Sequence, residues 1–158
     1  MSETPAAVQD FYPDDAAHCY GCGRLNDAGH KLRTFWDGDE TVTRFTPLPH
    51  HTAIPGYVYG GLVASVLDCS GTGSASLAML RREGREIGEG SSPRYVTAAL
   101  NVNFLKPTPL GPELVVRGVI KEITDRKVIV EETLSADGVV TATGSVVAVR
   151  MPDSMVAK

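Results

Sequence analysis

The chain has 158 residues, a formal net charge of −4 and 42% hydrophobic residues. That is the size of one domain, with enough apolar material for a core. The acidic balance, without a long run of lysine and arginine, argues against nucleic acid as a partner. No stretch approaches the ~18 apolar residues of a membrane span, and the first residues do not have the pattern of a secretory signal. Three cysteines, an odd number, argue against a disulfide framework. We therefore expect a cytoplasmic protein without a membrane span.

The beginning of the chain carries a possible metal pattern. Residues 1–17 are rich in proline, aspartate and alanine, and we expect a flexible lead-in to a single domain over residues 18–158. The domain opens on His18-Cys19-Tyr20-Gly21-Cys22, and Cys-x-x-Cys can be half of a zinc site, with His18 or His30 as further ligands, or a redox pair. No second cysteine pair follows, and the spacing to His30 does not fit a zinc finger. A structural turn is therefore favoured, and we expect no bound metal.

Residues 31–45 have the pattern of a β-hairpin. Two β-prone runs, KLRTFW and ETVTRF, flank Asp37-Gly38, and Asp-Gly in that position is a strong signal for a type I′ turn. The two histidines that follow, His50 and His51, have no acid or cysteine at ligand spacing. They are therefore expected to be loop residues and not metal ligands.

The run from Gly60 to about Leu80 is predicted to form one long helix, with no proline and a single acid. On a helical wheel three stripes separate. They are a bulky apolar face (Leu62, Val63, Val66, Leu67, Leu77), a face of small residues (Ala64, Gly71, Ala75, Ala78) and a polar stripe (Ser65, Asp68, Thr72, Ser76). Surface helices usually oppose their apolar face with long charged side chains. None occurs here before Arg81, so we expect a central helix covered on most sides.

From residue 95 onward the hydrophobic period changes to two, which is typical of strands. In the first strand one face is predicted to carry Val96, Ala98, Leu100, Val102 and Phe104, and the other Tyr95, Thr97, Ala99, Asn101 and Asn103. Three more strands are predicted over 114–123, 127–135 and 139–149. Short connections make antiparallel neighbours. The order of hairpin, helix and four strands therefore predicts a sheet curled around one helix, an α+β arrangement.

The turn and the helix together resemble a known family. Pro55-Gly56-x-x-Tyr59-Gly60-Gly61, with Asp68 eight residues after Gly60, is similar to the signature of the PaaI-like acyl-CoA thioesterases of the 4-hydroxybenzoyl-CoA thioesterase superfamily. The segments Asn101-Val-Asn103-Phe-Leu-Lys-Pro107 and Cys19-x-Gly-Cys-Gly also resemble members. The resemblance implies a hotdog fold, in which a curved antiparallel sheet wraps around one long central helix and the chain dimerises.

The resemblance also implies a reaction, the hydrolysis of an acyl-CoA or other pantetheine-linked thioester without a cofactor. Asp68 would be the general base for water or the nucleophile. The Gly60 backbone N–H would polarise the thioester carbonyl, as unpaired amides at a helix N-terminus can. Thr97 would orient the attacking water.

The chain departs from the family pattern at two places. The histidine that precedes the two glycines in the family is Tyr59 here. The asparagine or glutamine of the preceding turn is replaced by Thr52 or His51. With Gly61, these residues are the ones we expect to bind the substrate. For the CoA phosphates, the sequence offers Lys106, Arg81, Arg82 and Arg94 without choosing among them.

The spacing of the two principal residues makes a geometric demand. Eight helical residues separate Gly60 from Asp68 by ~12 Å, whereas the reacting groups must lie within ~3 Å of their donors. Two antiparallel copies of the helix would bring the glycine of one near the acid of the other, with the small face allowing close approach. We therefore expect a homodimer with shared sites, and leave a homotetramer open.

Two other functions remain open. A non-catalytic acyl-CoA-binding protein is one, because of Tyr59. An acyl-CoA hydratase or dehydratase is the other, because His51 before Pro55-Gly56 faintly resembles the turn of such enzymes. Hydratases of this kind carry a histidine five residues after the acid, where this chain has Gly73. That difference counts against the lyase.

Overall fold

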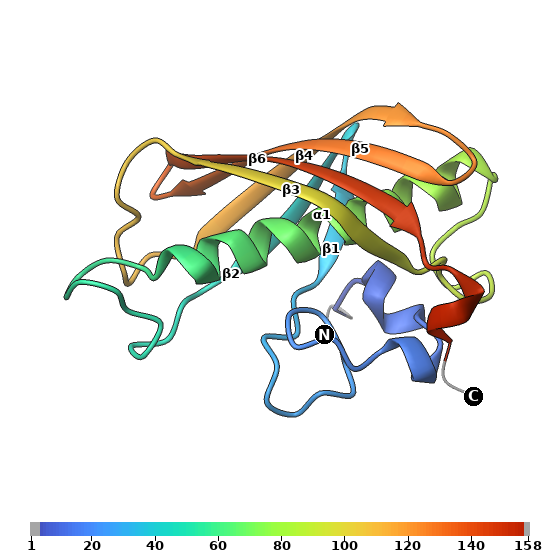
Figure 1. Cartoon of the computed structure of the whole chain (residues 1–158), viewed down its shortest axis with the longest axis horizontal. Helices are drawn as coiled ribbons and strands as arrows, with labels where there is room; N and C mark the ends of the chain where they lie inside the picture. Colours follow the sequence, from blue (N-terminus) through green and yellow to red (C-terminus); the bar gives the residue numbers. More distant parts are fainter. Residues whose placement is uncertain (1–3, 157–158) are drawn as a thin grey trace.

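The computed structural model describes residues 4–156 and consists of one long helix packed against one curved sheet (Figure 1). The sheet has the strand order β1-β2-β4-β5-β6-β3, and all neighbouring strands are antiparallel. This confirms the predicted α+β hotdog architecture. The elements are η1 (Val8–Phe11), η2 (Asp14–Ala16), β1 (Thr34–Asp37), β2 (Glu40–Phe45), α1 (Gly60–Arg82), β3 (Tyr95–Phe104), β4 (Leu114–Ile123), β5 (Lys127–Ala136), β6 (Val139–Arg150) and η3 (Asp153–Met155).

The two hairpin turns that contain Asp-Gly differ in a way that the sequence only half predicts. Between β5 and β6, Asp137 and Gly138 have φ values of 50° and 75°, and positive φ at both positions is the type I′ pattern. Between β1 and β2, Asp37 pairs with Glu40, so the loop consists of Gly38 and Asp39. There only Gly38 has a positive φ, 65°. Glycine at the first loop position matches type II′ and not the predicted type I′.

The small face of α1 packs on the sheet of its own chain. A Cβ added to Gly71 would lie 2.5 Å from Val146 of β6, and Ala75 and Ala78 belong to the buried cluster that includes Val146. The prediction that this face receives a second helix is therefore wrong for these three residues. Their small size lets the helix lie close to the sheet, and only Ala64 of the set is half-exposed.

The opposite side of α1 is covered by the beginning of the chain. Tyr12 and Ala17 pack with Leu62 and Val66 of the helix in the main core cluster. Gln9 is buried, and its side chain both donates to and accepts from Thr34. The composition predicts a flexible lead-in over residues 1–17, and within residues 4–17 the apolar side chains cover a helix face that the sheet cannot reach. Residues 1–3 lie outside the described residues.

A bulge in β3 changes which side chains face the helix. The pairing with β6 shifts between Thr97 and Ala99. Thr97 lies opposite Ala148 and Leu100 opposite Val146, and both partners are fully buried. The predicted alternation puts Thr97 and Leu100 on opposite faces. The bulge absorbs one residue and brings both to the helix side, as bulges re-aim side chains.

Candidate functional site

Asp68 and Thr97 are in direct contact. Asp68 is half-buried in the third turn of α1, and its Oδ1 accepts a hydrogen bond from the Thr97 hydroxyl of β3. A hydroxyl donor to a carboxylate is a charge-assisted bond, which fixes the orientation of the acid. Two of the three residues predicted to be catalytic are therefore brought together from a helix and a strand 29 positions apart in the chain.

The third predicted residue, Gly60, is the first residue of α1. Within the described residues no side chain caps this end, and the amides of Leu62 and Val63 donate to the Tyr59 carbonyl at 3.0 and 3.3 Å. The Gly60 and Gly61 amides thus have no intrahelical acceptor, and they stand at the positive end of the helix dipole. This end of the helix can receive a developing negative charge.

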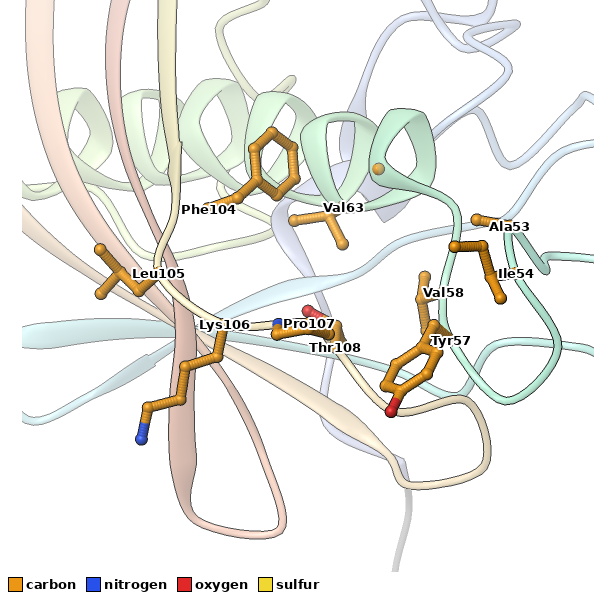
Figure 2. A pocket seen from close by; sticks show the side chains of 11 residues that line it. Ala53, Ile54, Tyr57, Val58, Val63, Phe104, Leu105, Lys106, Pro107 and Thr108 are labelled. Atoms are coloured by element: carbon orange, nitrogen blue, oxygen red, sulfur yellow. The ribbon is translucent and has the colours of Figure 1, made fainter.

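A cavity of about 530 Å³ opens beside Gly60, between the turn before α1 and the segment after β3 (Figure 2). The Val58 amide donates to the Thr108 carbonyl at 2.8 Å, which ties the two segments together. Most of the wall is apolar, as pockets for acyl-like groups require. The lining residues are Ala53, Ile54, Tyr57, Val58, Gly60, Val63, Phe104, Leu105, Lys106, Pro107 and Thr108.

Sequence analysis missed most of this wall. It gave residues 101–107 as a family resemblance and Lys106 as a candidate for the CoA phosphates, but did not predict that this segment lines a cavity. Phe104 and Leu105 are both 57% exposed, and two large apolar residues followed by Lys106-Pro107 at a strand end were the available signal. An exposed apolar cluster of this kind marks a binding surface more often than a core.

The other predicted substrate-binding residues do not line this cavity. Thr52 is exposed, and its hydroxyl contacts the carbonyls of Ile54 and Tyr57, 3.4 Å from each. The ring of Tyr59 lies over Gly61, where an added Cβ would come within 2.3 Å of it, so Gly61 leaves room for the tyrosine. The substrate-binding role of these three residues stays a prediction.

His51 belongs to an aromatic cluster with His30, His50 and Phe45. Its Nδ1 accepts a hydrogen bond of 2.8 Å from the Leu48 amide. Partial burial lowers the pKa of His51, and the nearby His50 and His30 lower it further. His51 thus shapes the turn that precedes α1, and a substrate contact from it stays a prediction.

A second carboxyl group, Glu132 of β5, lies in the core and was missed by sequence analysis. It is 3% exposed, and neither of its oxygens makes a hydrogen bond to the described residues. Burial raises the pKa of Glu132 well above its usual value. The Ser70 hydroxyl opposes this shift, and the charges of Asp68 and Glu131 add to it. An acid at a helix-facing position of a strand was the signal in the sequence.

The family pattern of the thioesterase superfamily matches residues 55–143, from the turn before α1 into β6. This chain belongs to the thioesterase superfamily. A thioesterase superfamily protein from Shewanella loihica is 49% identical, with a TM-score of 0.68 over 88% of this chain and 98% of that one. The PaaI protein of the E. coli phenylacetic acid degradation operon shares the fold at 13% identity, with a TM-score of 0.62 over 78% of this chain and 81% of that one.

Two curated relatives extend the comparison. Acyl-coenzyme A thioesterase THEM4 of Mus musculus is 32% identical over 96 residues, which is 61% of this chain and 36% of that protein. The Bos taurus THEM4 is 26% identical over 113 residues, 70% of this chain and 41% of that protein. The matches thus span less than half the length of these relatives. No helix in the described part of the chain is long and apolar enough to cross a membrane.

Proposed function

We propose that this protein hydrolyses acyl-CoA or other pantetheine-linked thioesters to a free acid and a thiol. Its membership of the thioesterase superfamily supports thioester hydrolysis as the class of reaction. The observation that carries the proposal is the half-exposed carboxylate of Asp68, which accepts a hydrogen bond from Thr97 of β3. The helix that carries Asp68 also has an uncapped N-terminus, and this end borders an apolar cavity. Base, oxyanion donors and an acyl-sized space are the parts that this reaction needs.

In this proposal the Gly60 amide donates to the thioester oxygen as negative charge develops on it. Asp68 either removes a proton from the attacking water or attacks the carbonyl itself, and Thr97 holds the acid in position. The thiol leaves as the tetrahedral intermediate collapses. The apolar wall beside Gly60 receives the acyl group or the pantetheine arm.

The two halves of this machinery come from two protomers. Gly60 and Asp68 are ~12 Å apart along the axis of one helix, too far to act on the same carbonyl. The free edge of β3 supports a second copy as the source of the missing half, because an unpaired strand edge is a template for another strand. The outward-facing residues of this strand are uncharged: Ala98, Ala99, Asn101 and Asn103 are all exposed.

The register of such a pairing follows from the contacts within one protomer. Gly60 lies beside Phe104, with an added Cβ 3.5 Å from its ring, and Asp68 lies beside Thr97. Two β3 strands paired antiparallel around Leu100 and Asn101 would set Phe104 opposite the partner's Thr97. The Gly60 amide would then lie toward the partner's Asp68. The two-fold axis of this pairing lies between Leu100 and Asn101, within about one residue of the middle of β3. Nearly the full strand can therefore pair symmetrically.

Among the four basic candidates for the CoA phosphates, the contacts favour Lys106. Arg82 pairs with Asp125 at 3.1 Å, Arg81 stacks on Trp36, and Arg94 donates to backbone carbonyls. Lys106 lines the cavity, makes no ion pair within the described residues, and extends away from the helix (Figure 2). Lys106→Ala should raise KM for acyl-CoA about fivefold with kcat unchanged, and an unchanged KM would remove Lys106 from the site.

The test is thiol release from a panel of acyl-CoAs, compared between the wild type, Asp68→Asn and the matched control Asp153→Asn. Asp153 is exposed in η3. We expect Asp68→Asn to lose ~10³-fold in kcat and the control to keep full activity. Full activity of Asp68→Asn would exclude the proposed base.

The same panel separates the alternatives. The position of Tyr59, where the family carries histidine, favours a non-catalytic acyl-CoA-binding protein as the second candidate. Binding without thiol release from any substrate would support that function. Hydration of an enoyl-CoA by the wild type would support the lyase instead.

A further inference from the structure

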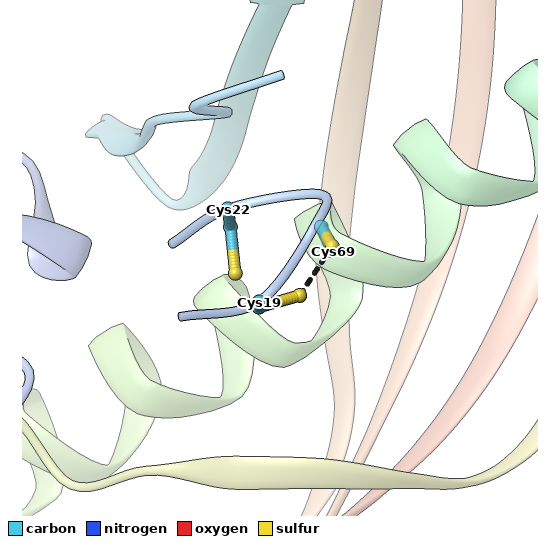
Figure 3. A group of neighbouring side chains, drawn as sticks. All are labelled: Cys19, Cys22 and Cys69. Carbon is cyan, nitrogen blue, oxygen red and sulfur yellow. Dashed lines mark hydrogen bonds between the residues drawn. The ribbon is translucent and has the colours of Figure 1, made fainter. Parts of the chain in front are cut away.

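Three thiols that are distant in the sequence meet on the covered side of α1. Cys19 and Cys22 come from the loop between η2 and β1, and Cys69 comes from the helix (Figure 3). Their sulfur atoms all lie within 4.8 Å of one another, and the Sγ atoms of Cys19 and Cys69 are 3.9 Å apart. In a tetrahedral zinc–thiolate site, Zn–S bonds of about 2.3 Å separate neighbouring sulfurs by about 3.8 Å. The cluster is already close to that geometry.

The loop is built so that its backbone lies against the helix. A Cβ on Gly21 would come within 2.2 Å of the Cys69 sulfur, and one on Gly23 within 2.4 Å of the Cys19 nitrogen. The Gly23 amide donates to the Cys19 carbonyl at 2.7 Å, which closes the turn between the two cysteines. Because these contacts fix the loop without any metal, the three sulfurs are positioned in advance of a ligand.

The surroundings fit an anionic metal–thiolate group. The Arg94 guanidinium lies in electrostatic reach of all three sulfurs, makes no ion pair with a carboxylate of the described residues, and stacks on the Tyr12 ring at 4.9 Å. A divalent ion with three thiolates carries one net negative charge, which this guanidinium would balance.

We propose that Cys19, Cys22 and Cys69 form a binding site for one thiophilic metal ion, Zn²⁺ or Cu⁺. Thiolate ligands select these ions over harder ones. On binding, three S–H bonds are replaced by three metal–sulfur bonds, and three protons pass to solvent without oxidation of sulfur. Cys19 is half-exposed, so an exogenous ligand can complete a zinc tetrahedron. This replaces the expectation, based on the missing second cysteine pair, that the chain binds no metal.

A bound ion would link the loop that carries Cys19 and Cys22 to Cys69, the residue that follows Asp68 in α1. Its contribution is therefore structural and acts on the helix that carries the acid. Binding to the folded protein stabilises it by mass action. Because metal retention and thiol protection are measured without substrate, the site can be tested whether or not the protein hydrolyses thioesters.

The experiment uses the full chain, purified under reducing conditions, and measures bound metals by elemental analysis. After chelation, Zn²⁺ and Cu⁺ are titrated separately against competing chromophoric chelators. Co²⁺ is added as a spectroscopic probe of thiolate coordination. We expect about one ion per chain and a rise in Tm of ~5 °C. The Cys69→Ala variant should bind on the order of 100-fold more weakly. Asp27→Asn, which changes an exposed acid of the same loop, serves as the control and should bind normally.

A second measurement needs no variant and therefore does not depend on the folding of Cys69→Ala. Zinc should slow the reaction of the wild-type thiols with a chromogenic disulfide reagent. Equal affinities in the wild type and Cys69→Ala, together with unprotected thiols, would overturn the site. A disulfide between Cys19 and Cys69 in the isolated protein, found by mass spectrometry, would also overturn it in favour of a redox pair.

Discussion

The two flanks of α1 carry similar polar residues but differ in access to solvent. On the flank toward β3, Gly61, Ala64, Ser65 and Asp68 are all half-exposed. On the flank toward β2, Ser70 and Ser74 are fully buried. There the Thr43 hydroxyl donates to Ser70 at 3.0 Å, and the hydroxyls of Thr41 and Ser74 are 2.6 Å apart. We refer to these as the open flank and the closed flank.

This comparison shows that partners, and not residue type, decide what a polar side chain can do. Each hydroxyl of the closed flank is bonded to another side chain and has no contact with solvent, so a ligand cannot reach it. On the open flank the only hydrogen bond of the Asp68 carboxylate within the described residues is to Oδ1, from Thr97. Its second oxygen is free to act on water. Changes on the open flank should therefore affect catalysis, and changes on the closed flank should affect stability.

After the loss of Asp68 itself, the largest effect is expected from removing the proposed oxyanion donor by Gly60→Pro. Proline lacks the N–H but suits the first helical position, and Tyr59 already has the extended conformation that precedes proline (φ −58°, ψ 128°). We expect kcat to fall ~10²–10³-fold. Gly60→Ala keeps the amide and, with an added Cβ at an ordinary 3.5 Å from Phe104, should remain active. Equal activity of the two variants would exclude this donor.

The same variant tests the shared site. Gly60→Pro and Asp68→Asn chains, unfolded and refolded together in equal amounts, would form mixed dimers in which one of two sites has both intact residues. About a quarter of the wild-type activity should return, as expected for random pairing in a two-fold dimer. If mixing restores nothing while light scattering shows dimers, each site lies within one protomer.

The Thr97→Val variant removes the hydrogen bond to Asp68 without changing the shape of the side chain. Because a hydrogen bond to a charged group contributes about 1.5–3 kcal/mol, kcat should fall ~10–100-fold. Thr97→Ser keeps the hydroxyl and should recover most of the rate. Equal activity of Thr97→Val and Thr97→Ser would contradict a role for the hydroxyl.

On the closed flank, Thr43→Val should cost stability and leave kcat unchanged. Thr43 is bonded to both Ser70 and Thr34, and leaving buried hydroxyls without partners costs about 1–3 kcal/mol. Chemical denaturation measures the loss, and Thr133→Val, at an exposed position of β5, is the control. A large fall in kcat without loss of stability would contradict the division into two flanks.

The smallest effect is expected from Glu132→Gln, and it should depend on pH. Since the pKa of Glu132 is raised in the folded protein, the folded state holds its proton more tightly than the unfolded state. Its contribution to stability is therefore lost as pH rises above the unfolded value of about 4.3. The glutamine variant should gain about 1 kcal/mol at pH 7, or ~2–4 °C in Tm, and nothing near pH 4. An equal gain in the free energy of unfolding at pH 4 and pH 7 would show that the glutamine acts through packing and not through the proton of Glu132.

Much of the fold is predictable because it follows from local pattern. The period of the helix, the alternation of the strands and the short turns predict β3 and β4 at both ends, and α1 to within about two residues of its end. The pairing of Thr97 with Asp68 is different, because it depends on a bulge that the alternation does not reveal. Nor does the period of α1 indicate which neighbour its small face meets.

The cysteines show the same division. Cys19 and Cys22 form a recognisable pair, but Cys69 is 47 residues further along the chain than Cys22 and appears in the sequence only as a small residue beside the acid. Whether a distant thiol joins the pair depends on which side of the helix the N-terminal loop covers. Sequence spacing contains no information on that choice.

For this protein the sequence by itself determines the elements, their order and the helix that carries Asp68, because backbone hydrogen bonding and burial impose short periods on neighbouring residues. The tertiary structure decides which side chains meet: Thr97 with Asp68, Cys69 with Cys19, and the turn before α1 with the segment after β3. The physical reason is that such contacts depend on strand register and on which faces pack together, and both are settled only when the whole core forms.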